Sequence, residues 1–328
     1  MTLPIAVDAM GGDFAPKEII EGARRAVDEL GLNVILVGVP ELMGDPLGLE
    51  VVACSEVIAM DDDPGVSVRK KKDSSLVRAA ELVRDRRASA MVSAGNTGAT
   101  MASALLRMGR LPGVIRPCIV TPIPNPGRTP VVLVDAGANA ECTPEMLVQF
   151  AQMGSTFVAT RYGVERPKVG LLSIGEEPTK GTPLVKATHQ LLNEMSTLNF
   201  VGNVEGRDFI PSPVDVIVTD GFTGNVALKT LEGALKFVFS TILEAIGTDD
   251  STRAAGDVLF EYLLPVASKL TPESQGGAML LGVAGICVIS HGSSNATAVM
   301  NAIRVAAEAA DEEIVSKLAA TIRPDQVP

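Results

Sequence analysis

The sequence of 328 residues contains no tryptophan, and aromatic residues make up only 3% of it. A nucleic-acid surface that stacks bases on aromatic rings is therefore not expected. The formal net charge of −11 also argues against a polyanion as the main partner, because phosphate backbones are bound by clusters of Lys and Arg. We expect no nucleic acid among the partners.

Cysteine is scarce as well. Cys54, Cys118, Cys142 and Cys287 are far apart and form no C-x-x-C pair, so neither a disulfide framework nor a zinc site is indicated. We interpret the four as reduced thiols and expect no metal. A strand pattern starts at Leu3, with no basic stretch followed by an apolar signal region, so a cytoplasmic location is expected.

Long hydrophobic runs are absent too. The longest candidate, residues 274–290, carries no charge but contains four glycines. It falls short of the roughly 20 residues that a membrane-spanning helix needs. We therefore expect buried strand and loop in this segment.

Short apolar runs alternate with helix-like segments along the chain. The pattern predicts strands at 5–8, 33–37, 50–54, 90–92, 131–134, 169–173, 200–202 and 214–219, and helices at 16–30, 74–85 and 97–108. Strands apolar on both faces, such as 131–134, are typical of a parallel sheet covered by helices. The fold class is therefore α/β, with three layers around a mostly parallel sheet, and we expect residues 1–328 to form a single domain.

Two amphipathic segments follow the last of these strands. Residues 225–246 have apolar positions at three- and four-residue spacing, which predicts one buried stripe, and residues 258–270 repeat the pattern. Glycine and polar residues at 247–251 supply a turn, so 225–270 is predicted to form a helical hairpin that projects from the sheet. Packing in a dimer and contact with a membrane surface are candidate uses of the hairpin.

Several predicted strands end in a turn of small residues that carries Asp or Asn. These turns are 8–13, 93–98, 135–141 and 220–225. The carboxyl ends of parallel strands lie at one edge of a sheet, so we expect the four turns to share one cleft. Glycine backbone and helix N-termini favour an anion such as phosphate there, although each turn taken alone is also explained as a tight connection.

Standard nucleotide motifs are missing. The chain has no G-x-G-x-x-G, and residues 175–182 resemble a phosphate-binding P-loop only superficially, so neither NAD nor ATP is expected. Lys180 lies in that loop, where it either reaches a bound phosphate or stays in solvent.

Only two histidines are present. His291 precedes Gly292, Ser293 and Ser294 in a turn before a helix, which makes it a candidate acid or phosphate ligand, or part of a plain capping turn. His189 is expected on a helix surface.

One basic run stands out in this acidic chain. Arg69, Lys70, Lys71 and Lys72 are consecutive, and three further arginines follow at 84–87. The run is either a solvated helix end or a docking site for an acidic partner.

Together these strings resemble the phosphate acyltransferase family PlsX. The resemblance is carried by residues 7–13, 69–75, 93–98, 135–139, 175–177, 202–208, 220–226 and 291–295, in the expected order. It implies transfer of a fatty acyl group from acyl-(acyl carrier protein) to inorganic phosphate, which gives acyl-phosphate for phospholipid synthesis. It also implies a fold similar to that of isocitrate and isopropylmalate dehydrogenases, a homodimer, and no metal or nucleotide cofactor.

The resemblance gives the basic run a purpose. Acyl carrier proteins are acidic, so Arg69 to Lys72 would steer one toward an enzyme that is itself negative. Inorganic phosphate is the second expected substrate. The long acyl chain needs an apolar groove, and the hairpin at 225–270 is the candidate for it. Contact with a membrane surface, or with the membrane acyltransferase that uses the product, is a further expectation.

These considerations select a set of candidate site residues. The catalytic candidates are Asn96, Lys180, Asn225 and His291: the amides would stabilise an oxyanion, Lys180 would hold phosphate, and His291 would protonate the leaving thiolate. The substrate-binding candidates are Asp8, Gly11, Gly12, Ser93, Gly95, Thr97, Gly98, Asp135, Asn139, Asp220, Ser293 and Ser294. Cys142 is interpreted as an inert turn residue, not as an acylated nucleophile.

Two rival functions remain at this point. A metal-dependent hydroxyacid dehydrogenase on the same fold would explain the Asp-bearing strand ends, but would require NAD. A non-enzymatic lipid carrier would bind acyl chains without turnover.

Overall fold

The computed structural model describes residues 3–246, 252, 256, 258–263 and 276–322. The described strands form one eleven-stranded sheet in the order β3-β2-β1-β4-β11-β10-β5-β6-β9-β7-β8. They are β1 (Ile5–Asp8), β2 (Val34–Gly38), β3 (Glu50–Ala53), β4 (Ala90–Ser93), β5 (Cys118–Ile123), β6 (Val131–Val134), β7 (Lys168–Leu172), β8 (Asn199–Val204), β9 (Val216–Val218), β10 (Ala278–Leu281) and β11 (Ile286–Ile289).

Helices cover both faces of the sheet, because successive strand residues point to opposite sides. One core cluster joins the sheet to α1 (Lys17–Leu30), α2 (Pro40–Met43), α6 (Pro144–Tyr162), α7 (Pro183–Glu194), α11 (Ala296–Asp311) and α12 (Ile314–Thr321). The other joins it to α3 (Pro64–Lys70), α4 (Ser75–Arg84), α5 (Thr97–Arg107), the 3₁₀ turn η1 (Gly206–Phe209) and the start of α8 (Gly221–Ile246). The prediction of a three-layer α/β fold is confirmed.

The direction of the strands changes in the middle of the sheet. β10 is antiparallel to both β11 and β5, and β5 is antiparallel to β6, whereas the other neighbours are parallel. As a result β6, β9, β7 and β8 run opposite to β3, β2, β1, β4 and β11. Their carboxyl ends therefore lie at the other edge of the sheet.

The segment 274–290 was predicted to be buried strand and loop. Within its described part, β10 and β11 are buried and lie in the centre of the sheet, next to each other. No described helix is both long enough and apolar enough to cross a membrane.

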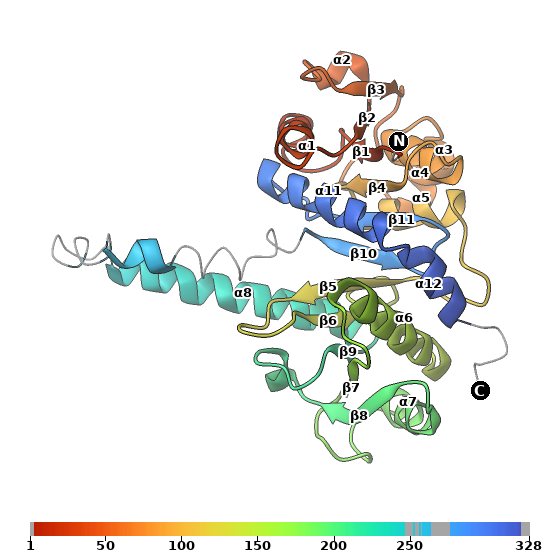
Figure 1. Cartoon of the computed structure of the whole chain (residues 1–328), viewed down its shortest axis with the longest axis vertical. Helices are drawn as coiled ribbons and strands as arrows, with labels where there is room; N and C mark the ends of the chain where they lie inside the picture. Colours follow the sequence, from red (N-terminus) through yellow and green to blue (C-terminus); the bar gives the residue numbers. More distant parts are fainter. Residues whose placement is uncertain (1–2, 247–251, 253–255, 257, 264–275, 323–328) are drawn as a thin grey trace.

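The long helix α8 extends away from the body of the molecule (Figure 1). It begins four residues earlier than predicted, at Gly221, and the buried stripe predicted along it is wrong. Its buried residues are the two glycines of its first turn, whereas Phe237, Val238 and Ile242 are 70%, 53% and 43% exposed. The periodicity therefore marks an apolar face that one copy of this chain leaves largely uncovered.

The predicted second arm of the hairpin is described only in part. Residues 258–263 are helical, and residues 264–270 lie outside the described residues. Gly256 lies against Ile246, since a methyl group on its Cα would be 2.1 Å from the Ile246 Cγ2 atom. The described end of the second arm therefore contacts the end of α8.

Candidate functional site

Three turns meet at the carboxyl ends of β1, β4 and β11, and we call them the first strand-end site (residues 8–13, 93–98 and 290–295). The Asp13 N–H donates to the Gly292 carbonyl at 2.8 Å, and the Ser290 N–H donates to the Ser93 carbonyl at 2.8 Å. A methyl group on Gly11 would lie 2.7 Å from the Gly95 nitrogen. Glycine at position 11 thus lets the first two turns touch through their backbones.

A buried carboxylate organises this site. Asp8 is 1% exposed and accepts hydrogen bonds from the Ser93 hydroxyl at 2.7 Å and the Met10 N–H at 3.1 Å. The Ser93 hydroxyl oxygen in turn accepts from the Gly95 N–H at 3.0 Å. Burial raises the pKa of Asp8, and hydrogen bonds from Ser75 and Ser93 oppose that rise. Asp8 and Ser93 are therefore buried residues that hold the backbone of these turns in place through hydrogen bonds.

Asn96 connects the same turn to helix α5. Its side-chain oxygen caps the helix by accepting from the Ala99 N–H at 3.0 Å. Its amide nitrogen donates to the carbonyls of Met60 at 2.8 Å and Asp62 at 3.1 Å. Because both ends of the amide are occupied, this geometry favours a positioning role, and a direct catalytic role for Asn96 stays a prediction.

The first turn of α5 offers hydrogen-bond donors to an anion. Helices leave the backbone N–H groups of their first turn without helical partners, and Thr97 and Gly98 are the first two residues of α5. Thr97 is exposed and Gly98 is half-buried. The helix dipole adds partial positive charge at this end, so the turn has the chemistry of a phosphate site.

His291 is exposed in the third turn of the site. Its Nδ1 lies 2.8 Å from the Ser293 hydroxyl and accepts from the Ser293 N–H at 3.2 Å. The Ser294 hydroxyl donates to the His291 carbonyl at 2.6 Å. An Nδ1 that accepts from an N–H places the proton of the neutral ring on Nε2. His291 is thus held as a donor whose Nε2 is free of the turn.

A second strand-end site lies at the carboxyl ends of β6 and β9 (residues 135–141 and 220–225). Asp135 is fully buried and its carboxylate accepts from four backbone N–H groups and one side-chain amide. The donors are Ile119 N at 2.9 Å, Gly137 N at 3.2 Å, Ala138 N at 3.0 Å, and Asn139 N and Nδ2, both at 2.8 Å. Burial raises the pKa of Asp135, opposed by these hydrogen bonds.

The two turns of the second site pack directly on each other. The Gly221 N–H donates to the Asn139 carbonyl at 2.8 Å, and a methyl group on Gly224 would lie 2.0 Å from the Asp135 carbonyl oxygen. Asp220 accepts from the N–H and hydroxyl of Thr223, both at 2.8 Å. Asn225 lies beside Gly137 and is exposed.

Lys180 belongs to the loop after β7, at the same edge as the second site. Its side chain is exposed and packs along Gly175, because a methyl group on Gly175 would lie 2.8 Å from the Lys180 Cγ atom. The loop is tied to β8 by the Asn203 amide, which donates to the Glu177 carbonyl at 2.9 Å.

The expectation that all four turns meet at one carboxyl edge is therefore wrong. The structure brings Asn96 and His291 together at one edge, and Asn225 and Lys180 at the other. The sequence predicted a mostly parallel sheet, and the four strands that end in these turns were taken to be parallel to one another. The prediction missed β5 entirely, and β5 is one of the strands whose antiparallel pairing reverses the second half of the sheet.

The predictions for Cys142 and His189 have different outcomes. Cys142 is half-buried, and burial raises the pKa of its thiol to about 11, which agrees with an inert turn residue. His189 was expected on the surface, but it is half-buried and packs edge-on against Phe200 with ring centroids 5.1 Å apart.

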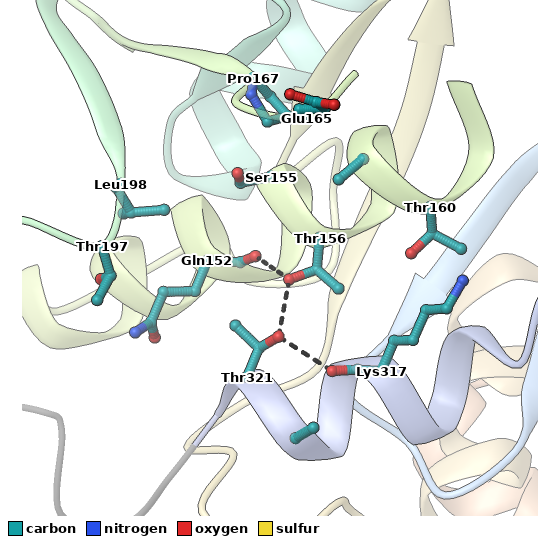
Figure 2. A pocket seen from close by; sticks show the side chains of 12 residues that line it. Gln152, Ser155, Thr156, Thr160, Glu165, Pro167, Thr197, Leu198, Lys317 and Thr321 are labelled. Carbon is teal, nitrogen blue, oxygen red and sulfur yellow. Dashed lines mark hydrogen bonds between the residues drawn. The ribbon is translucent and has the colours of Figure 1, made fainter. Parts of the chain in front are cut away.

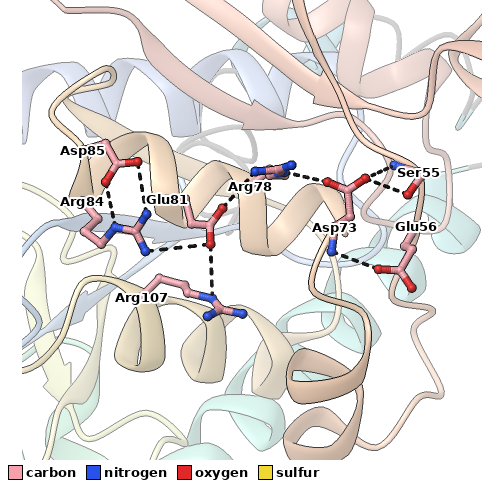
Figure 3. A network of polar contacts seen from close by, with 8 residues as sticks. All are labelled: Ser55, Glu56, Asp73, Arg78, Glu81, Arg84, Asp85 and Arg107. Atoms are coloured by element: carbon pink, nitrogen blue, oxygen red, sulfur yellow. Dashed lines mark hydrogen bonds and ion pairs between the residues drawn. The ribbon is translucent and has the colours of Figure 1, made fainter.

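The basic run forms the end of α3 and the connection to α4. Arg69, Lys70 and Lys72 are exposed, whereas Lys71 is half-buried and paired with Asp62 at 2.6 Å. The helix that ends in this run packs on the first site at its other end, since a methyl group on Gly98 would be 2.7 Å from Pro64 at the start of α3. On α4, Glu81 is surrounded by the cations of Arg78, Arg84 and Arg107 (Figure 3).

A separate pocket of about 490 Å³ lies between α6 and α12 (Figure 2). Thr156 bridges the two helices, because its hydroxyl lies 3.2 Å from that of Thr321 and donates to the Gln152 carbonyl at 2.9 Å. Lys317 and Glu165 are the charged residues among those that line it. None of its lining residues belongs to either strand-end site.

Solved structures define the class of fold. The chain is similar to a phosphotransacetylase from Streptococcus pyogenes, with 19% identity, a TM-score of 0.62 and 94% of each chain covered. A branched-chain phosphotransacylase from Enterococcus faecalis has 15% identity and a TM-score of 0.59, covering 94% of this chain and 99% of its own. A 4-hydroxythreonine-4-phosphate dehydrogenase from Salmonella typhimurium has 11% identity and a TM-score of 0.56, with 94% and 99% covered. At these identities the likeness concerns the fold alone.

Sequence relatives define the family. The family model described as "Fatty acid synthesis protein" matches residues 3–317. Phosphate acyltransferases from Leptospira biflexa and Elusimicrobium minutum are 47% and 48% identical over 324 residues, each across 96% of this chain and across 95% and 94% of their own lengths. The chain belongs to this phosphate acyltransferase family of fatty acid synthesis proteins. The resemblance read from its motifs is confirmed, and the chain is an acyltransferase.

Proposed function

We propose that this chain transfers a fatty acyl group from acyl-(acyl carrier protein) to inorganic phosphate, giving acyl-phosphate for phospholipid synthesis. The observation that carries the proposal is the near-full-length identity of 47% to a phosphate acyltransferase. The first strand-end site supports it, because its helix N-terminus, glycine backbone and hydroxyls suit a phosphate.

The first step is binding and orientation of phosphate. The N–H groups of Thr97 and Gly98 hold it at the start of α5, while Asp8 and Ser93 keep the turn in shape. Near pH 7 phosphate is already partly a dianion, so it needs orientation more than a strong general base. One phosphate oxygen attacks the thioester carbonyl carbon, and the carbonyl electrons move onto oxygen in a tetrahedral intermediate.

The second step is collapse of the intermediate. The carbon–oxygen double bond forms again, the carbon–sulfur bond breaks, and the thiolate of the carrier leaves. His291 donates its Nε2 proton to that sulfur, a role supported by the two hydrogen bonds that Nδ1 makes with Ser293. No residue of the enzyme is acylated in this scheme.

Two of the predicted catalytic residues lie at the edge of the second strand-end site. Lys180 and Asn225 are exposed at the edge where Asp135, Asn139 and Asp220 hold the turns. Their edge is the one opposite to the start of α5, so the predicted roles of Lys180 in phosphate binding and of Asn225 at the oxyanion are not part of this scheme and stay predictions.

The carrier protein is proposed to dock on the exposed cations at the end of α3 and in the connection to α4. Arg69, Lys70 and Lys72 carry positive charge in a chain whose net charge is −11. Such a local patch attracts an acidic carrier and orients it during encounter.

The acyl-phosphate assay tests the function. Purified chain, acyl-(acyl carrier protein) and inorganic phosphate should give free carrier and one acyl-phosphate per thioester consumed, measured by mass spectrometry. Omitting phosphate should stop carrier release. A folded protein that binds the acyl carrier protein but forms no acyl-phosphate would contradict the proposal, and carrier release without phosphate would indicate a thioesterase.

The apolar face of α8 is proposed to pack against a second copy in a homodimer. Phe237 is 70% exposed on α8, and Leu259, on the second arm of the hairpin, is 50% exposed. Side chains of this size favour burial by about 1.5–3 kcal/mol each. Contact with a membrane surface, or with the membrane acyltransferase that uses the product, is the alternative use of the same face.

We expect Phe237→Glu to raise the dimer dissociation constant at least about 100-fold, because each dimer would carry two substituted side chains. Analytical ultracentrifugation over a range of concentrations measures it. Ser240→Glu, which places the same charge at a nearby exposed polar position of α8, is the matched control. A dimer that is unchanged by Phe237→Glu, together with lost binding to phospholipid vesicles, would favour the membrane use instead.

A further inference from the structure

Lys71 differs from the three other cations of the basic run. Its ammonium group donates to the Asp62 carboxylate at 2.6 Å and to the Val57 carbonyl at 2.8 Å. The Lys71 side chain is 34% exposed and that of Asp62 is 27% exposed. Lys71 lowers the pKa of Asp62, assisted by the Ala59 N–H, which donates to the same carboxylate. The charge of Lys71 is therefore directed into the protein.

The partners of Lys71 belong to the segment 55–63, which connects β3 to α3. This segment supplies the two carbonyls, of Met60 and Asp62, that accept from the Asn96 amide. Asn96 in turn caps α5 at Ala99. Lys71 is thus two contacts away from the helix end to which we assign the phosphate.

The same segment also reaches the third turn of the first site. A methyl group on Gly292 would lie 2.9 Å from the Met60 Cε atom, so the Met60 side chain rests against the turn that carries His291. A shift of segment 55–63 would therefore displace both Asn96, which caps α5, and the turn that carries His291.

The other end of the segment is fixed by Asp73, immediately beyond the basic run (Figure 3). The Asp73 carboxylate accepts from the Ser55 N–H at 3.0 Å and the Ser55 hydroxyl at 2.6 Å, and the Asp73 N–H donates to Glu56 at 2.9 Å. Asp73 holds the start of the segment and Lys71 holds its end, where the contacts with Asn96 are made.

We propose that Lys71 is a positioning residue for acyl transfer and not a docking cation. Through Asp62 it fixes the carbonyls that hold Asn96, and through Asn96 it fixes the start of α5. The proposal rests on the function proposed above. It divides the basic run by role: Arg69, Lys70 and Lys72 face the carrier protein, while Lys71 faces the site.

The kinetic test compares Lys71→Met with Lys70→Met, since each removes one positive charge from the same run. We expect Lys71→Met to lower kcat about tenfold and to raise the KM for phosphate, because small displacements of oriented groups are costly in rate. Lys70→Met should instead raise the KM for the carrier-protein donor, with a steeper loss at low ionic strength. Lys71→Arg should restore most of the kcat. If Lys71→Met changes only the KM for the carrier protein, or changes nothing, the proposal is overturned.

Hydrogen exchange supplies a second readout that needs no turnover. The Ala99 N–H is protected by Asn96, so Lys71→Met should speed exchange in residues 57–63 and 97–100 relative to Lys70→Met. The ion pair is partly exposed, so the midpoint of urea unfolding should change little. Equal exchange in the two variants would refute the positioning role even in a protein whose acyl-phosphate assay had failed. Faster exchange combined with a failed assay would refute the proposed function alone.

Discussion

Replacing Gly11 with alanine is expected to lower kcat/KM for phosphate about 100-fold or more. The added methyl group would lie 2.5 Å from an Asp8 carboxylate oxygen and 2.7 Å from the Gly95 backbone nitrogen. The Asp8 carboxylate is buried and held by the Ser93 hydroxyl, and the Gly95 nitrogen belongs to the backbone, so the two turns must separate. A displacement of this kind in an oriented site costs about two orders of magnitude in rate. Steady-state kinetics at saturating acyl donor would measure it.

Gly233→Ala is the matched control for this prediction. Among the described residues, no atom outside the neighbouring helix backbone lies within 4 Å of the position that a methyl group on Gly233 would take, and the residue is exposed on α8. Alanine there should stabilise the helix by about 1 kcal/mol and leave the kinetics unchanged. Because Gly11→Ala also strains the fold, Ser93→Ala provides a milder test: it removes the hydroxyl that joins Asp8 to the Gly95 N–H without adding bulk. A Gly11→Ala enzyme with normal phosphate kinetics would argue against the first strand-end site.

Periodicity in the sequence was enough to predict the layers of the fold. Runs such as 131–134 are apolar on both faces because they become β6, buried on both sides of the sheet. The start of α5 was predicted at Thr97, and the helix does begin there, with Asn96 as its N-cap. These predictions succeed because they depend on neighbours in sequence.

Strand direction did not follow from the same signals. An apolar strand has the same sequence pattern whether its neighbour is parallel or antiparallel. The reversal at β10 and β5 could therefore not be predicted from the pattern of either strand. The prediction therefore placed Asp135 and Asp220 at the same edge as Asp8 and Ser93, whereas the structure places them at the opposite edge. Pairing partners distant in sequence decide such questions, and the pattern of a single strand does not contain them.

The role of Lys71 was hidden for a related reason. Four consecutive cations in an acidic chain read as one patch, and charge patterning gives no means of separating them. The separation comes from Asp62, which the fold places at 2.6 Å from Lys71 alone. In α8 the failure has another cause: the three- and four-residue periodicity does mark an apolar face, but the described residues leave that face largely exposed.

Removing the Asp135 carboxylate should destabilise the protein by at least about 3 kcal/mol in Asp135→Ala. The backbone N–H groups of Ile119, Ala138 and Asn139 would lose their acceptor inside the protein. Each unsatisfied buried donor costs about 1–3 kcal/mol. Burial of the carboxylate is itself unfavourable, as the raised pKa of Asp135 shows. Alanine removes that cost, so the expected loss of stability lies near the lower end of the summed range. Urea unfolding monitored by circular dichroism gives the free energy.

Asp220→Ala distinguishes a buried organiser from an ordinary capping residue at the same edge. Asp220 is half-buried, and among the described residues its carboxylate accepts only from the N–H and hydroxyl of Thr223, so its loss should cost about 1 kcal/mol. Asp135→Asn should fall between the two variants, because the amide keeps one acceptor oxygen for the N–H groups and turns the other position into a donor. If Asp135→Ala lost no more stability than Asp220→Ala, the five hydrogen bonds would not be what holds the second strand-end site together. The packing of Gly221 and Gly224 against residues 135–139 would then be the stronger explanation, since both glycines approach that turn too closely to admit a side chain.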